Sequence, residues 1–198
     1  MSTHGDAATT VLLCGVGGQG TILAADVLAK TAIRAGLEVK LSEVHGMSQR
    51  GGAVTTTVRF GREVASMVTD LGCADYLVSF EITEALRNVP FLKQGGFLLV
   101  NDESIKPLPV LTGKAAMPAN ARERLEKLGA ALIPATQMAV RSGSAKCANV
   151  VLIGALAARM EFPLELWEEV IASRVPPKTV EVNRTAFHAG VDFARALS

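Results

Sequence analysis

Two glycine-rich motifs in this chain have residue types that suit the binding of an anion. The first, Gly15–Gly20, reads GVGGQG and directly follows the apolar run Val11–Cys14. The second, Ser48–Gly52, reads SQRGG and comes about one β-α-β unit later. A glycine-rich turn between a buried strand and a helix lets several backbone N–H groups converge on one point, which suits a phosphate or another anion. Glycine is expected there because the turn needs positive φ and close packing.

The first motif, here called the glycine turn, predicts an anion site. Its residues are Gly15, Gly17, Gly18, Gln19, Gly20 and Thr21. Tight packing of strand on helix without a ligand would produce the same pattern. A P-loop is excluded because no lysine precedes Thr21. A dinucleotide site stays open, since Glu43 stands near the end of the next expected strand, where a ribose-binding acid would lie.

The second motif predicts a rigid loop that presents its backbone and one arginine to a partner or an anion. Its residues are Ser48, Arg50, Gly51 and Gly52. Arg50 would serve as a fork-shaped hydrogen-bond donor. The alternative is a flexible loop with a solvated arginine.

The elements that would position these motifs alternate between strand and helix. We expect strands at 11–14, 39–44, 53–60, 76–80, 96–100 and 130–134, and helices at 19–35, 82–89, 121–128 and from 145 onward. Val- and Thr-rich Ala53–Phe60, followed by Gly61-Arg62, predicts an antiparallel hairpin with Glu63–Val68. The fold class expected is α/β: a three-layer α/β/α single domain with a mixed, mostly parallel sheet and a Rossmann-like start.

Two later stretches complete a pattern that resembles a known family. Asn149 begins an apolar helix that runs to Leu156, and Lys178, Asn183 and Ala186-Phe187 form a K…N…AF series. With the two glycine motifs, these stretches resemble the γ-type domain of 2-oxoacid:ferredoxin oxidoreductases. The resemblance is greatest to the small (β) subunit of the indolepyruvate branch. Asn149, Lys178 and Asn183 are expected to be structural or interface anchors.

The resemblance implies one part of a larger enzyme. A large catalytic subunit with thiamine and ferredoxin-type domains would hold thiamine diphosphate, Mg²⁺ and iron–sulfur clusters. The complex would decarboxylate a 2-oxoacid (an arylpyruvate in this branch), reduce ferredoxin and form an acyl-coenzyme A. The glycine turn would then contact coenzyme A phosphates.

Sequence motifs for iron–sulfur ligation and for thiamine binding are missing from this chain. Cys14, Cys73 and Cys147 form no C-x-x-C pair, and no G-D-G motif of a thiamine site occurs. We therefore expect no catalytic residue, no metal and no cofactor bound by the chain alone, and no activity without its partner. The alternatives are a stand-alone NAD(P)- or FAD-binding oxidoreductase and a nucleotide-sensing module.

Composition narrows the class of protein further. The 198 residues include 20 Lys and Arg and 19 Asp and Glu, which gives a net charge of +1. We therefore expect no electrostatic affinity for nucleic acid or membranes. Three scattered cysteines fit a reducing compartment, and neither a signal peptide nor a membrane span is recognised, so we expect a cytoplasmic protein. Residues 1–10 are expected to be a flexible N-terminus and residues 11–198 one domain.

Overall fold

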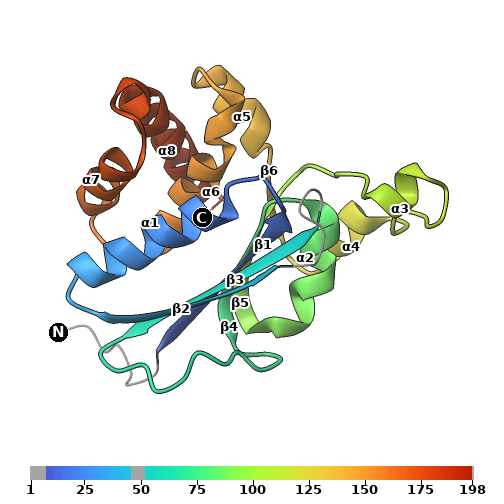
Figure 1. Cartoon of the computed structure of the whole chain (residues 1–198), viewed down its shortest axis with the longest axis horizontal. Coiled ribbons are helices and arrows are strands. Elements are labelled where there is room, and N and C mark those ends of the chain that lie inside the picture. Colours follow the sequence, from blue (N-terminus) through green and yellow to red (C-terminus); the bar gives the residue numbers. More distant parts are fainter. Residues whose placement is uncertain (1–7, 46–51, 198) are drawn as a thin grey trace.

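The computed structural model describes residues 8–45 and 52–197, which form a sheet with helices on both faces (Figure 1). The strands in this part of the chain are β1 (Thr9–Val16), β2 (Glu38–His45), β3 (Ala53–Gly61), β4 (Ala74–Ser79), β5 (Leu92–Asn101) and β6 (Ala131–Ile133). The α-helices are α1 (Thr21–Arg34), α2 (Ile82–Asn88), α3 (Leu108–Leu111), α4 (Ala121–Lys127), α5 (Ala135–Arg141), α6 (Ala148–Ala157), α7 (Leu164–Arg174) and α8 (Val180–Arg195). Short 3₁₀ turns η1, η2 and η3 cover Val89–Phe91, Ala145–Cys147 and Pro177–Thr179.

The sheet is mixed, as expected, with the strand order β2-β3-β1-β4-β5-β6. The pairs β1–β4, β4–β5 and β5–β6 are parallel. Strand β3 lies antiparallel between β1 and β2. The three-layer α/β/α prediction is therefore confirmed.

The predicted hairpin partner of β3 was wrong. Glu63–Val68 is not a strand, and β3 pairs instead with β2, Leu41 facing Val58. The Arg59 side chain donates to the carbonyls of Ser66 and Val68 at 2.8 and 3.0 Å. These carbonyls are therefore bonded to a side chain and not to a strand ladder. Both antiparallel neighbours of β3, strands β1 and β2, therefore precede it in the chain.

Alternating side chains of β1 serve two hydrophobic cores. Val11 and Leu13 face the core built with α1, α5, α6, α7 and α8, which cover one side of the sheet in Figure 1. Leu12 and Cys14 face a smaller core with α2 and α4 on the other side. Because β1 is buried on both faces, its sequence is continuously apolar instead of alternating.

Helix α6 is buried all round because it packs closely against α8. A Cβ on Gly154 would lie 2.0 Å from the Phe187 carbonyl oxygen, and one on Gly190 would lie 1.9 Å from the Val151 carbonyl oxygen. The two glycines thus let the helix backbones approach one another.

Several element boundaries differ from the prediction. Strand β1 begins at Thr9, so Thr9 and Thr10 belong to the sheet and not to a flexible terminus. Helix α1 begins at Thr21 because Gly20, its N-cap, has the left-handed φ of +83°. Helix α5 was not expected at all. Its sequence follows β6 after only Pro134, with no turn residues to mark it.

Candidate functional site

The glycine turn lies at the carboxyl end of β1, where the strand order of the sheet reverses. After β1 the chain passes through α1 on one face, and after the neighbouring β4 it passes through α2 on the other. In open α/β sheets the crevice outside such a reversal is where ligands bind. The turn is therefore at the position where this fold most favours a site.

Backbone geometry distinguishes the glycines of the turn. Gly18 and Gly20 have φ values of +96° and +83°, which side-chain-bearing residues rarely adopt. Gly17 is not in that region, and a Cβ there would meet only the Gly52 carbonyl oxygen at 3.8 Å. The positive φ expected of the turn is therefore found at Gly18 and Gly20 and not at Gly17. The role of Gly17 is to donate its N–H to the Gly52 carbonyl at 3.0 Å.

Gln19 supports the turn from within. Its Oε1 accepts from the Val16 N–H at 2.7 Å, and its Nε2 donates to the Phe80 carbonyl at 3.0 Å. Gly15 makes room for this amide, because a Cβ there would lie 2.7 Å from Gln19 Oε1 and 2.8 Å from Phe80 Cβ. The side chain of Gln19 is therefore engaged in bracing the turn against the end of β4.

Asn149 holds the opposite side of the turn. It is 5% exposed, and its Nδ2 donates to the Gly20 carbonyl at 3.4 Å. Cys147 is the N-cap of α6, so Asn149 is an anchor and not a cap. Its Oδ1 accepts from the Val150 N–H at 3.0 Å. The two motifs that the sequence analysis linked only by resemblance are thus in contact.

Two amide hydrogens of the turn lack a hydrogen-bond partner in the part of the chain that the structure describes. No hydrogen bond between described residues satisfies the N–H groups of Gly18 and Gly20. The first turn of α1 has no acidic residue, and no side chain caps its N-terminus. Because this 14-residue helix directs its positive dipole end at the same place, the turn favours a negatively charged group.

The other predicted site residues divide into three groups. Thr21 is buried at 3% exposure and begins α1. Ser48, Arg50 and Gly51 lie outside the described residues, whereas the Gly52 carbonyl accepts the Gly17 N–H.

Lys178 is exposed in η3. Asn183 Nδ2 donates to the Thr179 carbonyl at 2.8 Å, and this hydrogen bond fixes the start of α8.

A polar network at the end of β5 was not predicted from the sequence. Asn101 Nδ2 donates to the same Phe80 carbonyl that Gln19 uses, at 3.2 Å. It also lies within hydrogen-bond distance of Glu103 and Thr136. A single asparagine after an apolar run has no periodicity that would mark it. Only its place at the carboxyl edge of the sheet could have suggested it.

Buried ionisable groups line the start of α2. Glu81, 1% exposed, accepts the Glu84 N–H, and Glu84 is paired with Arg87 at 2.9 Å. Burial raises the pKa of Glu84, and the Glu81 charge adds to that rise while Arg87 opposes it. Burial also raises the pKa of the Cys14 thiol to about 12, so it stays neutral and is a core residue.

The position of Glu43 argues against a dinucleotide site. Glu43 pairs with Thr56 on β3, which pairs with Leu13 on β1. In the dinucleotide-binding order, the strand that carries the ribose-binding acid lies next to the first strand. Here β3 separates them, so Glu43 is one strand too far from the glycine turn.

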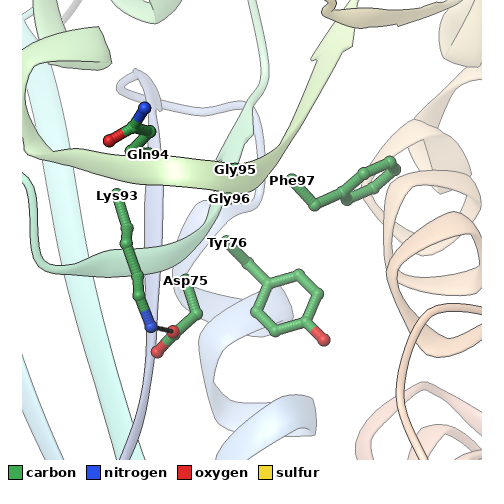
Figure 2. Close-up of a pocket in the computed structure, with 7 residues that line it drawn as sticks. All are labelled: Asp75, Tyr76, Lys93, Gln94, Gly95, Gly96 and Phe97. Carbon is green, nitrogen blue, oxygen red and sulfur yellow. Dashed lines mark hydrogen bonds and ion pairs between the residues drawn. The ribbon is translucent and has the colours of Figure 1, made fainter.

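A shallow hollow of about 420 Å³ lies near the amino end of β4, at the other end of the sheet (Figure 2). Three of its polar side chains already have partners. Lys93 lies 3.1 Å from Asp75, which also accepts the Thr10 N–H, and the Tyr76 hydroxyl donates to the Arg159 carbonyl at 3.0 Å. With these groups occupied, the hollow has less capacity to recognise a ligand than the turn has.

The family described as Pyruvate ferredoxin/flavodoxin oxidoreductase matches residues 10–193. The chain belongs to this family. Its curated relatives in the family include the "Indolepyruvate oxidoreductase subunit IorB" of Thermococcus kodakarensis, which is 42% identical over 94% of this chain and 96% of the relative.

Solved structures of the family agree with the fold. The keto/oxoacid ferredoxin oxidoreductase gamma subunit of Geobacter sulfurreducens is 28% identical with a TM-score of 0.71, covering 95% of this chain and 99% of that one. A 2-oxoglutarate:ferredoxin oxidoreductase of Magnetococcus marinus, solved with 2-oxoglutarate, coenzyme A and succinyl-CoA, is 24% identical with a TM-score of 0.76. That match covers 96% of this chain but 32% of the other, so there the same fold is part of a longer chain.

The family assignment confirms the prediction of a small subunit of a 2-oxoacid:ferredoxin oxidoreductase. Within residues 8–45 and 52–197, no group of three or more His, Cys, Asp or Glu side chains could hold a metal ion. The same residues contain no helix with the length and apolar character needed to span a membrane.

Proposed function

We propose that this chain is the small subunit of an oxidoreductase for indolepyruvate and related arylpyruvates. The support is the 42% identity to a subunit of that name along nearly the full length of both chains. A larger subunit with thiamine and ferredoxin-type domains would hold thiamine diphosphate, Mg²⁺ and the iron–sulfur clusters and would reduce ferredoxin. Three scattered cysteines without a described disulfide support a cytoplasmic location.

The chemistry of the described residues fits an anionic substrate better than a metal cofactor. Cys14, Cys73 and Cys147 form no C-x-x-C pair of the kind that holds iron–sulfur clusters. The free N–H groups at the N-terminus of α1 instead suit phosphate oxygens. In this proposal the large subunit carries the cofactors, which supply decarboxylation and electron transfer, and this chain contributes binding and orientation.

The glycine turn would bind a phosphate group of coenzyme A. The observation that carries this assignment is that no described residue accepts from the N–H groups of Gly18 and Gly20, which lie at an uncapped helix N-terminus without a first-turn acid. The amide braces Gln19 and Asn149 would keep the turn in shape before the ligand arrives. Such preorganisation lowers the cost of binding.

The second motif would serve as an interface or ligand loop. Its last residue, Gly52, already accepts the Gly17 N–H. We expect Arg50→Ala to leave the melting temperature of the isolated chain unchanged. If Arg50 contacts the large subunit, the variant will lose co-purification. If it contacts coenzyme A, the KM for coenzyme A will rise in an intact complex. No change in either quantity would reject the assignment.

A charge placed in the first turn of α1 tests the phosphate site. Ile22 is 55% exposed there, and Ile22→Glu would put a carboxylate where the ligand's phosphate is expected. The matched control is Ile22→Gln, which has the same shape without the charge. A second control is Ile33→Glu, which places the same charge near the other end of α1 at a residue that is 57% exposed.

In the complex reconstituted with the large subunit, we expect Ile22→Glu to raise the KM for coenzyme A about tenfold over Ile22→Gln, as a loss of roughly 1.4 kcal/mol would. Stability should not fall, because an acid near a helix N-terminus is favourable. Equal KM values for the glutamate and glutamine variants would contradict the phosphate site.

A further inference from the structure

Asn101 is a highly connected polar side chain at the carboxyl edge of the sheet. It ends β5 and is 3% exposed. Its Oδ1 accepts the Ala135 N–H at 3.0 Å, and its Nδ2 lies 3.2 Å from the Phe80 carbonyl and 3.0 Å from Glu103 Oε2. An asparagine amide can serve both as acceptor and as donor in this way, which no apolar or purely anionic side chain can do.

The Phe80 carbonyl joins Asn101 to the glycine turn. It accepts from Asn101 Nδ2 and from Gln19 Nε2, while Gln19 Oε1 accepts from the Val16 N–H. A continuous series of hydrogen bonds therefore runs from the start of α5, through the ends of β5 and β4, to the end of β1. If the Asn101 donor were removed, the Phe80 carbonyl would keep only its hydrogen bond from Gln19.

Glu103 connects the same network to α2. Its Oε2 accepts from the Thr136 hydroxyl at 2.6 Å as well as from Asn101. Its backbone carbonyl accepts the Ile82 N–H at 2.9 Å, at the first residue of α2. The network thus fixes three segments around the crevice: the glycine turn, the start of α2 and the start of α5.

From this arrangement we infer that Asn101 is a positioning residue for the glycine turn. By holding the Phe80 carbonyl, it fixes the Gln19 amide, and through Gln19 it sets the backbone from which the N–H groups of Gly18 and Gly20 project. This inference rests on the proposed phosphate site, because it describes how that site is kept in register. Asn101 itself does not contact the ligand; it acts through Gln19.

The test is Asn101→Asp in the reconstituted complex. Aspartate keeps the shape of the side chain and the acceptor for Ala135, but it loses the donor to Phe80 and faces the Glu103 carboxylate. We expect the KM for coenzyme A to rise roughly three- to tenfold, the effect of one lost hydrogen bond. The kcat at saturating coenzyme A and the KM for the 2-oxoacid should not change.

A second variant separates positioning from simple stabilisation. In Asn101→Asp combined with Glu103→Gln, the new amide removes the repulsion between carboxylates and can donate to the aspartate. It does not restore the donor to Phe80. We therefore expect the melting temperature to recover while the KM for coenzyme A stays high. Recovery of both would show that Asn101 is merely structural and would overturn the inference. If the single variant does not fold, the double variant carries the test.

The Ile22 variants distinguish failure of this inference from failure of the proposed function. A raised KM in Ile22→Glu with an unchanged KM in Asn101→Asp would reject the positioning role and keep the phosphate site. An unchanged KM in both would reject the two together.

Discussion

Gly20 and Asn149 interlock: the Asn149 amide donates to the Gly20 carbonyl at 3.4 Å and occupies the space that a side chain on Gly20 would need. A Cβ on Gly20 would lie 2.6 Å from Asn149 Nδ2. The glycine turn is therefore constrained twice at this position, by its φ of +83° and by its neighbour on α6. This contact links the first glycine motif to the Asn149 helix, two stretches of the family pattern that lie far apart in the sequence.

The first prediction separates these two constraints. Gly20→Ala should lower the free energy of unfolding by about 2–4 kcal/mol, because it adds a steric clash to the cost of a left-handed residue. Gly36→Ala is the matched control, since Gly36 has the same φ of +83° with nothing within 4 Å of its Cβ position. That variant should lose only about 1–2 kcal/mol. Urea unfolding of both measures the difference, and equal losses would show that Asn149 does not constrain the turn.

The second prediction concerns the crossing of α6 and α8. Gly154→Ala should destabilise the protein by about 1–3 kcal/mol or more, because its methyl group would meet the Phe187 backbone carbonyl, which cannot rotate away. Thermal unfolding gives the measurement. Because Gly154 lies within α6 and outside the positive-φ region, where alanine is a good helix former, a loss of stability would come from the close approach alone. A Gly154→Ala protein as stable as the wild type would disprove the close approach.

The third prediction follows from the raised pKa of Glu84. The folded state holds the proton of this carboxyl to higher pH than the unfolded state, whose pKa is near 4.5. The corresponding stability is fully present below pH 4.5 and is lost as the pH rises through the folded pKa. Glu84→Gln removes this titration. The free energy of unfolding of the variant should therefore fall less than that of the wild type as the pH rises from 4.5 to 7.

Parallel wild-type and Glu84→Gln profiles over that range would contradict a raised pKa. Urea titrations at several pH values supply the comparison.

The fourth prediction concerns thiol reactivity. Cys73 is exposed, whereas Cys14 and Cys147 are buried with raised pKa values, that of Cys14 to about 12. A thiol reagent at pH 8 should therefore label the native chain at Cys73 alone. Cys73→Ser should abolish fast labelling, and denaturant should expose the remaining two thiols. Rapid labelling of native Cys73→Ser would show that the core around Cys14 opens.

Much of the scaffold could be predicted because its signals are local. Continuous apolar runs followed by glycine mark β1 and its turn, and helical spacing from Ile22 onward marks α1. The pairing of β3 could not be predicted in this way. A segment can pair with β3 only if its backbone N–H and carbonyl groups are free to form strand hydrogen bonds. In the loop that follows β3, the Arg59 side chain already donates to two of the carbonyls.

The turn was predicted, but the roles of its residues were not all foreseen. Gln19 was expected at the ligand, and its amide instead braces Val16 and Phe80. Positive φ was expected of the turn as a whole, and the structure has it at Gly18 and Gly20 but not at Gly17. Asn101 was missed because its importance comes from residues far away in the sequence, such as Phe80 and Ala135. Such contacts leave no spacing pattern.

We propose that this chain is a required, non-catalytic part of a 2-oxoacid:ferredoxin oxidoreductase. The most direct measurement mixes the purified chain with its large subunit and follows reduction of a viologen dye by indolepyruvate and coenzyme A. We predict that the chain alone is colourless and inactive, that the large subunit alone is impaired, and that the mixture restores turnover. Turnover by the isolated chain, or full activity of the large subunit without it, would contradict the account.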